Sequence, residues 1–183
     1  MKAHSRTIIN SEKLNLMIDR LCHELIENHN DFGNSAILGL QPRGGILASR
    51  IHKRLIDITG NSGILHGTID ATLNRDDLGR REIPILPSST SIDFQLEDRD
   101  VILIDDVLFT GRTIRAGLDA MLAFGRPNTV ELLVLVDRRF SRQLPIEPKY
   151  IGTTIDTIST ERVGVNLNED DDSSVTLYSE QRK

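Results

Sequence analysis

The most informative segment of this chain is Val101-Ile-Leu-Ile-Asp-Asp-Val-Leu-Phe-Thr-Gly-Arg-Thr113. It begins with four aliphatic residues, which are typical of a strand buried on both faces of a parallel sheet. Two adjacent carboxylates, Asp105 and Asp106, follow at the expected carboxyl end of that strand, where ligands bind in open α/β sheets. The small-residue turn Thr110-Gly-Arg-Thr113 then leads into an amphipathic helix predicted over residues 113–124.

The turn before this helix has the chemistry of a phosphate site. A helix start that follows small residues offers free backbone N–H groups and the positive end of the helix dipole. Thr110 and Thr113 add hydroxyl donors, and Gly111 lets the backbone approach a ligand closely. Each residue alone is also explained as a strand end or a helix cap. Their order, with two acids for sugar hydroxyls ahead of a phosphate cradle, favours a sugar 5-phosphate.

Helices and strands alternate along the rest of the chain, which predicts a mostly parallel α/β sheet flanked by helices. Apolar residues at three- and four-residue steps predict two more helices, and short aliphatic runs predict six more strands. The helices are expected over 11–28 and 46–58, and the strands over 35–40, 64–69, 129–136, 150–158, 163–167 and 175–178. We find no internal repeat and no linker, so a single domain over residues 1–183 is expected.

Composition narrows the class of protein. Hydrophobic residues make up 38% of the 183 positions but aromatic ones only 4%, so the core must be largely aliphatic. The single cysteine, Cys22, excludes an internal disulfide framework and a multi-cysteine metal site. The first six residues lack the apolar core of a signal peptide, and no apolar run approaches the ~20 residues that span a bilayer. We therefore expect a soluble cytoplasmic protein with no membrane partner. The net charge of −5 gives no general attraction to nucleic acid, although a local basic patch could exist.

The segment 101–113 resembles the 5-phosphoribosyl-1-pyrophosphate (PRPP) signature of type I phosphoribosyltransferases. Further stretches resemble one family, the PyrR proteins, which combine pyrimidine-operon attenuation with uracil phosphoribosyltransferase activity. They include Asp70-Ala-Thr-Leu-Asn-Arg-Asp-Asp-Leu78, Phe124-Gly-Arg-Pro127, Val134-Leu-Val-Asp-Arg138 and Tyr150-Ile-Gly152. The resemblance covers residues 18–178. It implies a type I phosphoribosyltransferase fold with a small hood over about 138–159 and a flexible lid loop over about 71–98.

The resemblance also implies an activity and a set of site residues. PRPP and uracil would react to give UMP and diphosphate, with Mg²⁺ bound through PRPP or pyrophosphate and not by protein side chains alone. Asp105 and Asp106 would contact the ribose hydroxyls, and Arg43 would stabilise the leaving pyrophosphate together with Gly44. The 5-phosphate would be held by the loop residues Phe109, Thr110, Gly111, Arg112 and Thr113. An ordinary turn with a surface arginine is the alternative for residues 43–44.

Two further parts of the site are expected on the same grounds. Arg75, Asp76 and Asp77 would begin the lid that closes over the substrate, although a plain disordered insertion has the same composition. Backbone groups of the segment from Ile151 to Thr157, with Ile151, Gly152 and Thr153 as the named candidates, would recognise the pyrimidine edge.

The family's regulatory role rests on a basic face that binds a messenger-RNA leader hairpin, and the protein is expected to be a dimer or tetramer. Arg20, His23, Arg138 and Arg142 are the candidate RNA contacts, although His23 is equally explained as a solvated helix residue. Asp19 stands where the family commonly has Thr, and Asn28 and Thr153 stand where it has cations. Because phosphate contacts supply much of the affinity for RNA, we expect weak RNA binding with catalysis retained.

Three other functions compete with this interpretation. The chain could be a non-catalytic regulator that senses PRPP or UMP, since fold does not fix function. A purine-type phosphoribosyltransferase would share the same sugar-phosphate motif. A flavodoxin-like binding module would not explain the paired aspartates ahead of Thr110.

Overall fold

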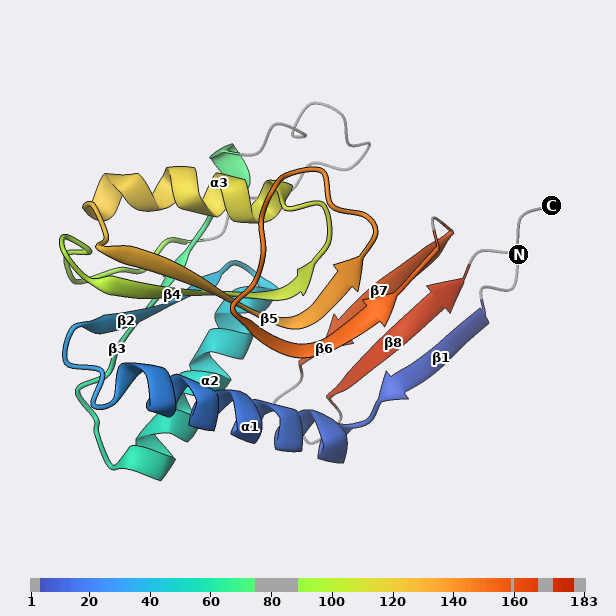
Figure 1. Cartoon of the computed structure of the whole chain (residues 1–183), viewed down its shortest axis with the longest axis horizontal. Helices are drawn as coiled ribbons and strands as arrows, with labels where there is room; N and C mark the ends of the chain where they lie inside the picture. Colours follow the sequence, from blue (N-terminus) through green and yellow to red (C-terminus); the bar gives the residue numbers. More distant parts are fainter. Residues whose placement is uncertain (1–3, 75–88, 159, 168–172, 180–183) are drawn as a thin grey trace.

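A five-stranded parallel sheet forms the centre of the computed structural model, which describes residues 4–74, 89–158, 160–167 and 173–179 (Figure 1). The strand order is β3-β2-β4-β5-β6, and every neighbouring pair is parallel. The strands are β2 (Ser35–Leu40), β3 (Leu65–Ile69), β4 (Asp100–Leu108), β5 (Thr129–Arg139) and β6 (Tyr150–Asp156). The predicted α/β class with a parallel sheet is confirmed.

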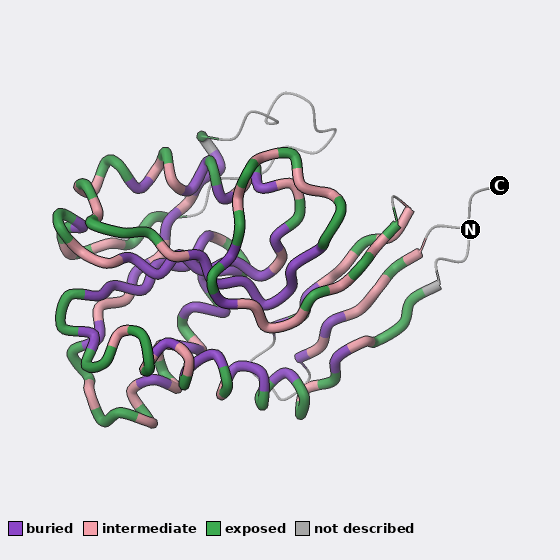
Figure 2. The backbone as a smooth tube through the Cα atoms, viewed as in Figure 1, coloured by how far each residue is buried: buried purple, intermediate pink, exposed green. Residues whose placement is uncertain are grey.

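Helices cover both faces of this sheet. α1 (Ser11–His29) and α2 (Arg43–Thr59) lie on one face, and α3 (Arg112–Met121) lies on the other (Figure 1). Alternate residues of the aliphatic run in β4 pack against the helices on opposite faces of the sheet, because successive side chains of a strand point to opposite faces. Ile102 and Ile104 pack with α1 and α2, whereas Val101 and Leu103 pack with α3. The inner strands β2, β4 and β5 are accordingly buried along most of their length, whereas β3 and β6 at the sheet edges are largely half-buried (Figure 2).

The helix boundaries have local causes. Asn10 begins α1 by accepting a hydrogen bond from the Lys13 backbone N–H at 3.0 Å. Gly60 ends α2 in a left-handed conformation, with φ 71°. α2 begins at Arg43, three residues before the predicted start, so Arg43 and Gly44 lie in its first turn. α3 continues into the short 3-10 helix η3 (Leu122–Phe124).

A second, three-stranded antiparallel sheet is formed from segments near the two ends of the chain (Figure 1). Its order is β1-β8-β7, from β1 (His4–Ile9), β7 (Glu161–Asn166) and β8 (Ser174–Ser179). β1 was not predicted. Residues 138–159, where the hood was expected, instead contain β6 and the end of β5, which belong to the main sheet.

The expected lid loop is described only in part. Arg75, Asp76 and Asp77 lie outside the described residues, which resume after the 3-10 helix η1 (Thr72–Asn74) at residue 89. Beyond that point the chain packs onto the body. Ser91 pairs with Thr68, and Leu96 is fully buried with its N–H donating to the Phe124 carbonyl oxygen. Residues 89–98 are a loop, as predicted, with no helix or strand beyond the bridge of Ser91, and their apolar residues complete the core beneath α3. The movement of the lid stays a prediction.

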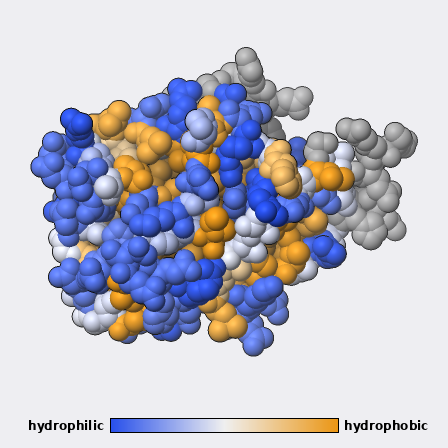
Figure 3. All heavy atoms as spheres, in the orientation of Figure 1, coloured by the Kyte–Doolittle hydropathy of each residue, from blue (hydrophilic) through white to orange (hydrophobic). Residues whose placement is uncertain are grey.

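The outer surface in the view of Figure 3 carries hydrophobic atoms in separate patches among hydrophilic ones. Within the described chain, no helix is both long and apolar enough to span a bilayer.

Candidate functional site

The two aspartates predicted to contact a sugar lie side by side near the carboxyl end of β4, between β2 and β5. Both are buried, with 7% and 8% of Asp105 and Asp106 exposed. The Asp106 N–H donates to Asp105 Oδ1 at 2.9 Å, and the Val107 N–H donates to Asp106 Oδ1 at 2.9 Å. Asp106 Oδ2 is buried, and within the described part of the chain it accepts no hydrogen bond. Such an oxygen is costly unless a ligand supplies a donor.

Arg43 is the cation nearest to this oxygen. Its Nη1 lies 3.7 Å from Asp106 Oδ2, which is within range for an ion pair but too long for a hydrogen bond. Burial raises the pKa of Asp106, and the Arg43 guanidinium opposes that rise. The Arg43 side chain is 59% exposed. It can therefore turn toward an anion without breaking a buried contact.

Gly44 brings the start of α2 against the aspartates. A Cβ atom on Gly44 would lie 2.4 Å from the Ile104 carbonyl oxygen and 3.2 Å from Asp105 Oδ1. Neither Gly44 nor Gly45 has a positive φ, so backbone conformation does not require glycine at either position. The glycine is required because helix and strand approach too closely for a side chain.

The predicted phosphate loop follows β4 directly and ends at α3. Gly111 has φ 90°, which favours glycine, and precedes the first helical residue, Arg112. The N–H groups of Thr110 and Gly111 meet no acceptor within the described residues. The Arg112 side chain turns outward, where its Nε donates to Gln143 Oε1 at 2.8 Å. Unpaired amides at the positive end of a helix, next to two carboxylates, suit a phosphorylated sugar.

A hollow of about 900 Å³ lies beside this loop. Its walls include Phe109, and the others come from the end of β5, the segment after β5, the segment after β6 and the start of β7: Arg138, Phe140, Ser141, Arg142, Gln143, Thr157, Ile158, Glu161, Arg162 and Val163. The Arg138 guanidinium lies 4.1 Å from the centre of the Phe109 ring. It also donates to Thr157 Oγ1 at 3.1 Å and to the Glu161 carbonyl at 3.0 Å.

Sequence reasoning missed this hollow, although a signal for it was present. β5 ends in the charged residues Asp137, Arg138 and Arg139, and β5 is paired in parallel with β4. The rule that located Asp105 and Asp106 at a strand's carboxyl end therefore applies equally to β5.

Of the segment expected to recognise a base, Thr157 lines this hollow, whereas Ile151, Gly152 and Thr153 do not. Ile151, Gly152 and Thr153 lie in the middle of β6, where Arg20 of α1 donates to the carbonyls of Ile151 and Gly152 at 2.8 Å each. A Cβ on Gly152 would lie 2.4 Å from the Leu135 carbonyl oxygen. The strand continues to Asp156, and only its carboxyl end reaches the edge where the loops gather.

The four candidate RNA contacts fall into two groups. Arg20 and His23 lie on α1, where Arg20 is also paired with Glu24 and His23 is exposed. Arg138 and Arg142 line the hollow beside the phosphate loop instead, and Arg138 is only 7% exposed. These two arginines have contacts inside the protein that their sequence positions did not reveal.

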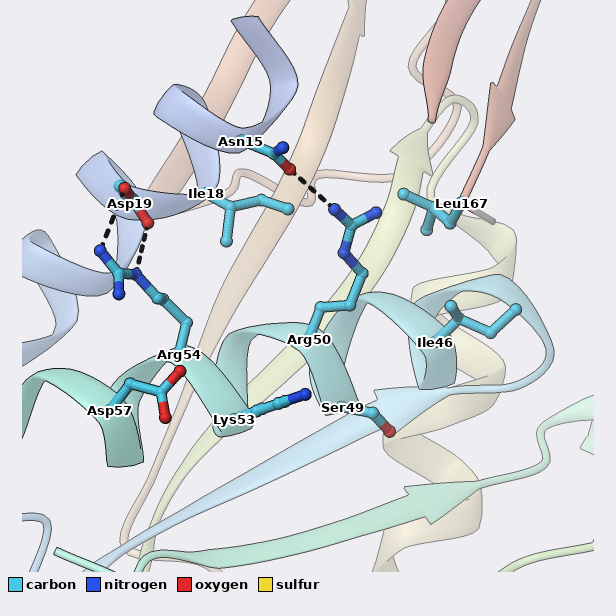
Figure 4. A pocket seen from close by; sticks show the side chains of 10 residues that line it. All are labelled: Asn15, Ile18, Asp19, Ile46, Ser49, Arg50, Lys53, Arg54, Asp57 and Leu167. Atoms are coloured by element: carbon cyan, nitrogen blue, oxygen red, sulfur yellow. Dashed lines mark hydrogen bonds and ion pairs between the residues drawn. The ribbon is translucent and has the colours of Figure 1, made fainter. Parts of the chain in front are cut away.

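Asp19, which stands where the family commonly has Thr, is held by Arg54. The two carboxylate oxygens accept from Arg54 Nε at 2.6 Å and Nη2 at 3.2 Å, across a groove between α1 and α2 (Figure 4). Much of the negative charge of Asp19 is therefore balanced by Arg54.

Comparison with known proteins defines the class first. Residues 5–170 match the family model described as the phosphoribosyl transferase domain. A hypoxanthine phosphoribosyltransferase of Trypanosoma cruzi superimposes with a TM-score of 0.67 at 14% identity, covering 93% of this chain and 95% of the other. One from Staphylococcus aureus gives 0.63 at 20% identity, covering 82% and 78%. At these identities the likeness shows the shared fold.

Full-length relatives then define the family. The bifunctional protein PyrR of Elusimicrobium minutum is 42% identical over 174 residues, covering 94% of this chain and 96% of the relative. The bifunctional protein PyrR of Bacillus subtilis is 41% identical over 175 residues, covering 93% and 95%. The chain belongs to the PyrR family of phosphoribosyltransferase-domain proteins.

Proposed function

We propose that this protein is a uracil phosphoribosyltransferase that converts uracil and PRPP to UMP and diphosphate. The observation that carries the proposal is the buried Asp106 carboxylate, with one oxygen lacking a hydrogen bond, beside Arg43 and directly ahead of a loop with unpaired amides. A ribose with a 5-phosphate and a 1-diphosphate complements each of these groups. Its hydroxyls suit the carboxylate, its diphosphate suits Arg43, and its 5-phosphate suits the loop amides. The bifunctional PyrR relatives support uracil as the base.

The reaction needs no covalent enzyme intermediate. The uracil N1 atom forms a bond to the ribose anomeric carbon as the carbon–oxygen bond to diphosphate breaks, and the N1 proton is released. Positive charge grows on the ribose and negative charge on the diphosphate, so fixed charges around them lower the barrier. Asp105 and Asp106 hold the ribose hydroxyls, and Arg43 faces the departing diphosphate. The loop from Phe109 to Thr113 fixes the 5-phosphate, which orients the ribose for attack.

The donor set also fits Mg²⁺ bound through the substrate. Ionised carboxylates and substrate phosphates are the hard oxygen ligands that Mg²⁺ prefers. Asp106 provides a buried oxygen without a hydrogen-bond donor, and Asp105 lies next to it. When bound, the ion would neutralise charge on the leaving diphosphate.

We place the base in the hollow beside Phe109, and not against residues 151–153. The hollow starts at the residue that opens the phosphate loop, so a base there lies next to the ribose. Its size falls within the ~300–1,000 Å³ of small-ligand sites. The ring of Phe109 and the polar groups of Thr157 and Glu161 give it both a stacking face and hydrogen-bonding partners.

A steady-state assay with PRPP, Mg²⁺ and each of uracil, cytosine, hypoxanthine and guanine tests this function. We expect nucleotide formation with uracil. Product with a purine alone would support the purine-type enzyme, and no product from any base, while PRPP still binds, would support a non-catalytic PRPP sensor. A Phe109→Ala variant should raise the KM for uracil more than the KM for PRPP, because the loop backbone is kept.

A further inference from the structure

We infer that residues 142–144 form a clasp that orients the amides of the phosphate loop, with Arg142 as its principal positioning residue. The inference rests on the proposed binding of a phosphorylated ribose. Residues 142–144 lie outside the PRPP motif, and the motif contains the phosphate loop but not the residues that hold it.

The clasp holds two consecutive carbonyl groups of the loop. Arg142 Nη1 donates to the Phe109 carbonyl oxygen at 2.8 Å. The N–H groups of Gln143 and Leu144 both donate to the Thr110 carbonyl oxygen, at 3.0 and 3.2 Å. Both carbonyls are therefore directed toward the clasp.

Peptide geometry fixes the direction of the loop N–H groups that are proposed to bind the phosphate. In a planar trans peptide, the C=O of one residue and the N–H of the next point in opposite directions. The only cis peptide among the described residues is Gln41–Pro42, so the two loop peptides are trans. The N–H groups of Thr110 and Gly111 must then point away from the clasp. Neither of these two N–H groups has an acceptor in the described part of the chain.

Arg142 is itself fixed from the main sheet. Its Nη2 is hydrogen-bonded and ion-paired with Asp137, and both side chains are largely buried, at 23% and 11% exposed. Asp137 of β5 is paired in register with Leu108 of β4, the residue before the loop. A rigid connection thus runs from β5 through Asp137 and Arg142 to the first loop carbonyl. Apolar contacts close the same side, because a Cβ on Gly111 would lie 3.2 Å from Ile146 Cδ1.

A hydrogen bond between neutral groups would hold the loop less firmly. The charged guanidinium makes the stronger kind of hydrogen bond. If Arg142 is removed, the Phe109–Thr110 peptide can rotate and its N–H no longer points at the phosphate. We therefore expect the affinity for a ribose 5-phosphate group to fall by about tenfold or more.

The test compares Arg142→Met, Arg142→Lys and a matched control, Arg139→Gln, whose exposed ion pair with Asp156 lies on the same strand end. Isothermal titration measures binding of ribose 5-phosphate and of pyrophosphate separately, and thermal melting reports stability. Arg142→Met should weaken ribose 5-phosphate binding by about tenfold and leave pyrophosphate binding unchanged. Arg142→Lys should restore part of the loss, and Arg139→Gln should match the wild type.

The outcomes separate the clasp from the proposed function. If the wild type binds neither ribose 5-phosphate nor PRPP, the proposed function fails and the clasp has no ligand to serve. If the wild type binds and Arg142→Met binds ribose 5-phosphate equally well, only the clasp is overturned. Equal losses for ribose 5-phosphate and pyrophosphate, with a lowered melting temperature, would make Arg142 a general structural residue and would also overturn it. Should Arg142→Met fail to fold, Arg142→Lys carries the test, with a smaller loss confined to ribose 5-phosphate.

Discussion

The Asp106 carboxylate is buried at a desolvation cost that the nearby Arg43 guanidinium offsets in part. One oxygen of its carboxylate is satisfied by the Val107 N–H, while the other is buried without a hydrogen bond and has Arg43 at 3.7 Å. Active sites commonly keep groups whose pKa is shifted by burial and nearby charge, because those groups are reserved for the substrate. Asp105 and Asp106 were predictable from the sequence because a strand's end and paired acids are both visible there. The orphaned oxygen and the position of Arg43 required three-dimensional packing.

Replacing both aspartates tests their assignment to the ribose. In the double variant Asp105→Asn with Asp106→Asn we expect turnover to fall by at least about a hundredfold, since two charged hydrogen bonds to the ribose are lost. The fold should persist, because the amides have nearly the same shape and remove buried charge. UMP formation and circular dichroism are the measurements. Near-normal turnover in a folded double variant would contradict the assignment.

The pH dependence of PRPP binding should depend on Arg43. Burial raises the pKa of Asp106 and Arg43 opposes that rise, so removing the cation must raise the pKa further. Protonation of Asp106 at low pH removes a hydrogen-bond acceptor for the ribose. PRPP binding should therefore weaken as pH falls, and in Arg43→Gln the loss should begin at a higher pH.

Isothermal titration of PRPP over about pH 4 to 8 gives this comparison. Lys53→Gln is the matched control, because Lys53 lies on the same helix and contacts neither aspartate in the described structure. An acid limb at the same pH in Arg43→Gln and in the wild type would show that the two groups are not coupled.

At the scale of secondary-structure elements, prediction succeeded where burial alone selects the sequence. β2, β4 and the middle of β5 are aliphatic runs because both faces of the sheet are covered there, and α1 has an apolar face because only one side is buried. β1 was missed because its first residues, Ser5 to Thr7, are exposed in a sheet of three strands.

The extent of β5 and the position of residues 151–153 in the sheet could not be read from the sequence, for one shared reason. Charged residues at the end of β5 look irregular in sequence, yet they continue the strand to Arg139. The register that places Ile151 of the edge strand β6 opposite Val134, away from the carboxyl end of the sheet, is set by strand pairing, which no single segment reveals. Sequence located the chemistry of the site but not which strand ends meet there.

A contact between two elements makes stability sensitive to acid. His66 of β3 stacks on His52 of α2, with ring centres 4.8 Å apart, and His66 Nε2 is buried without a partner among the described residues. Burial, together with the charge of His52, lowers the pKa of His66 below its usual 6.5. The unfolded chain therefore takes up a proton first as pH falls. The contribution of neutral His66 is complete above about pH 6.5 and is lost as pH falls toward its lowered folded pKa.

Urea unfolding at a series of pH values measures this effect. The free energy of unfolding of the wild type should decline below about pH 6.5, and His66→Gln should decline less. His23→Gln is the control, since His23 is exposed on α1. Parallel declines in the wild type and His66→Gln would assign the acid sensitivity to other groups.

At the scale of the whole molecule, the distribution of cations bears on the second role that the relatives' bifunctional name implies. The net charge of −5 opposes approach to RNA, so a binding face must come from local cations. The structure directs several of them inward. Arg138 is buried over Phe109, Arg142 holds the phosphate loop, and Arg20 donates to the carbonyls of β6. Cations that already have protein partners gain less from contact with a phosphate backbone.

We therefore predict that RNA binding is weak or absent while catalysis persists. Asn28 and Thr153 stand where the family has cations, and each phosphate contact contributes roughly 0.7 to the slope of log affinity against log salt for single strands. Losing two contacts should flatten that slope by about 1.4. Filter binding of a pyrimidine-operon leader hairpin, with UMP present and at several salt concentrations, measures both the affinity and the slope.

The double variant Asn28→Arg with Thr153→Lys should tighten RNA binding and steepen the slope by about 1.4, whereas Lys53→Arg should change neither. A wild-type dissociation constant of about 10⁻⁸ M at physiological salt would overturn the prediction, because it is typical of specific complexes. The cations used for RNA would then be His23, Lys149 or those of a second subunit.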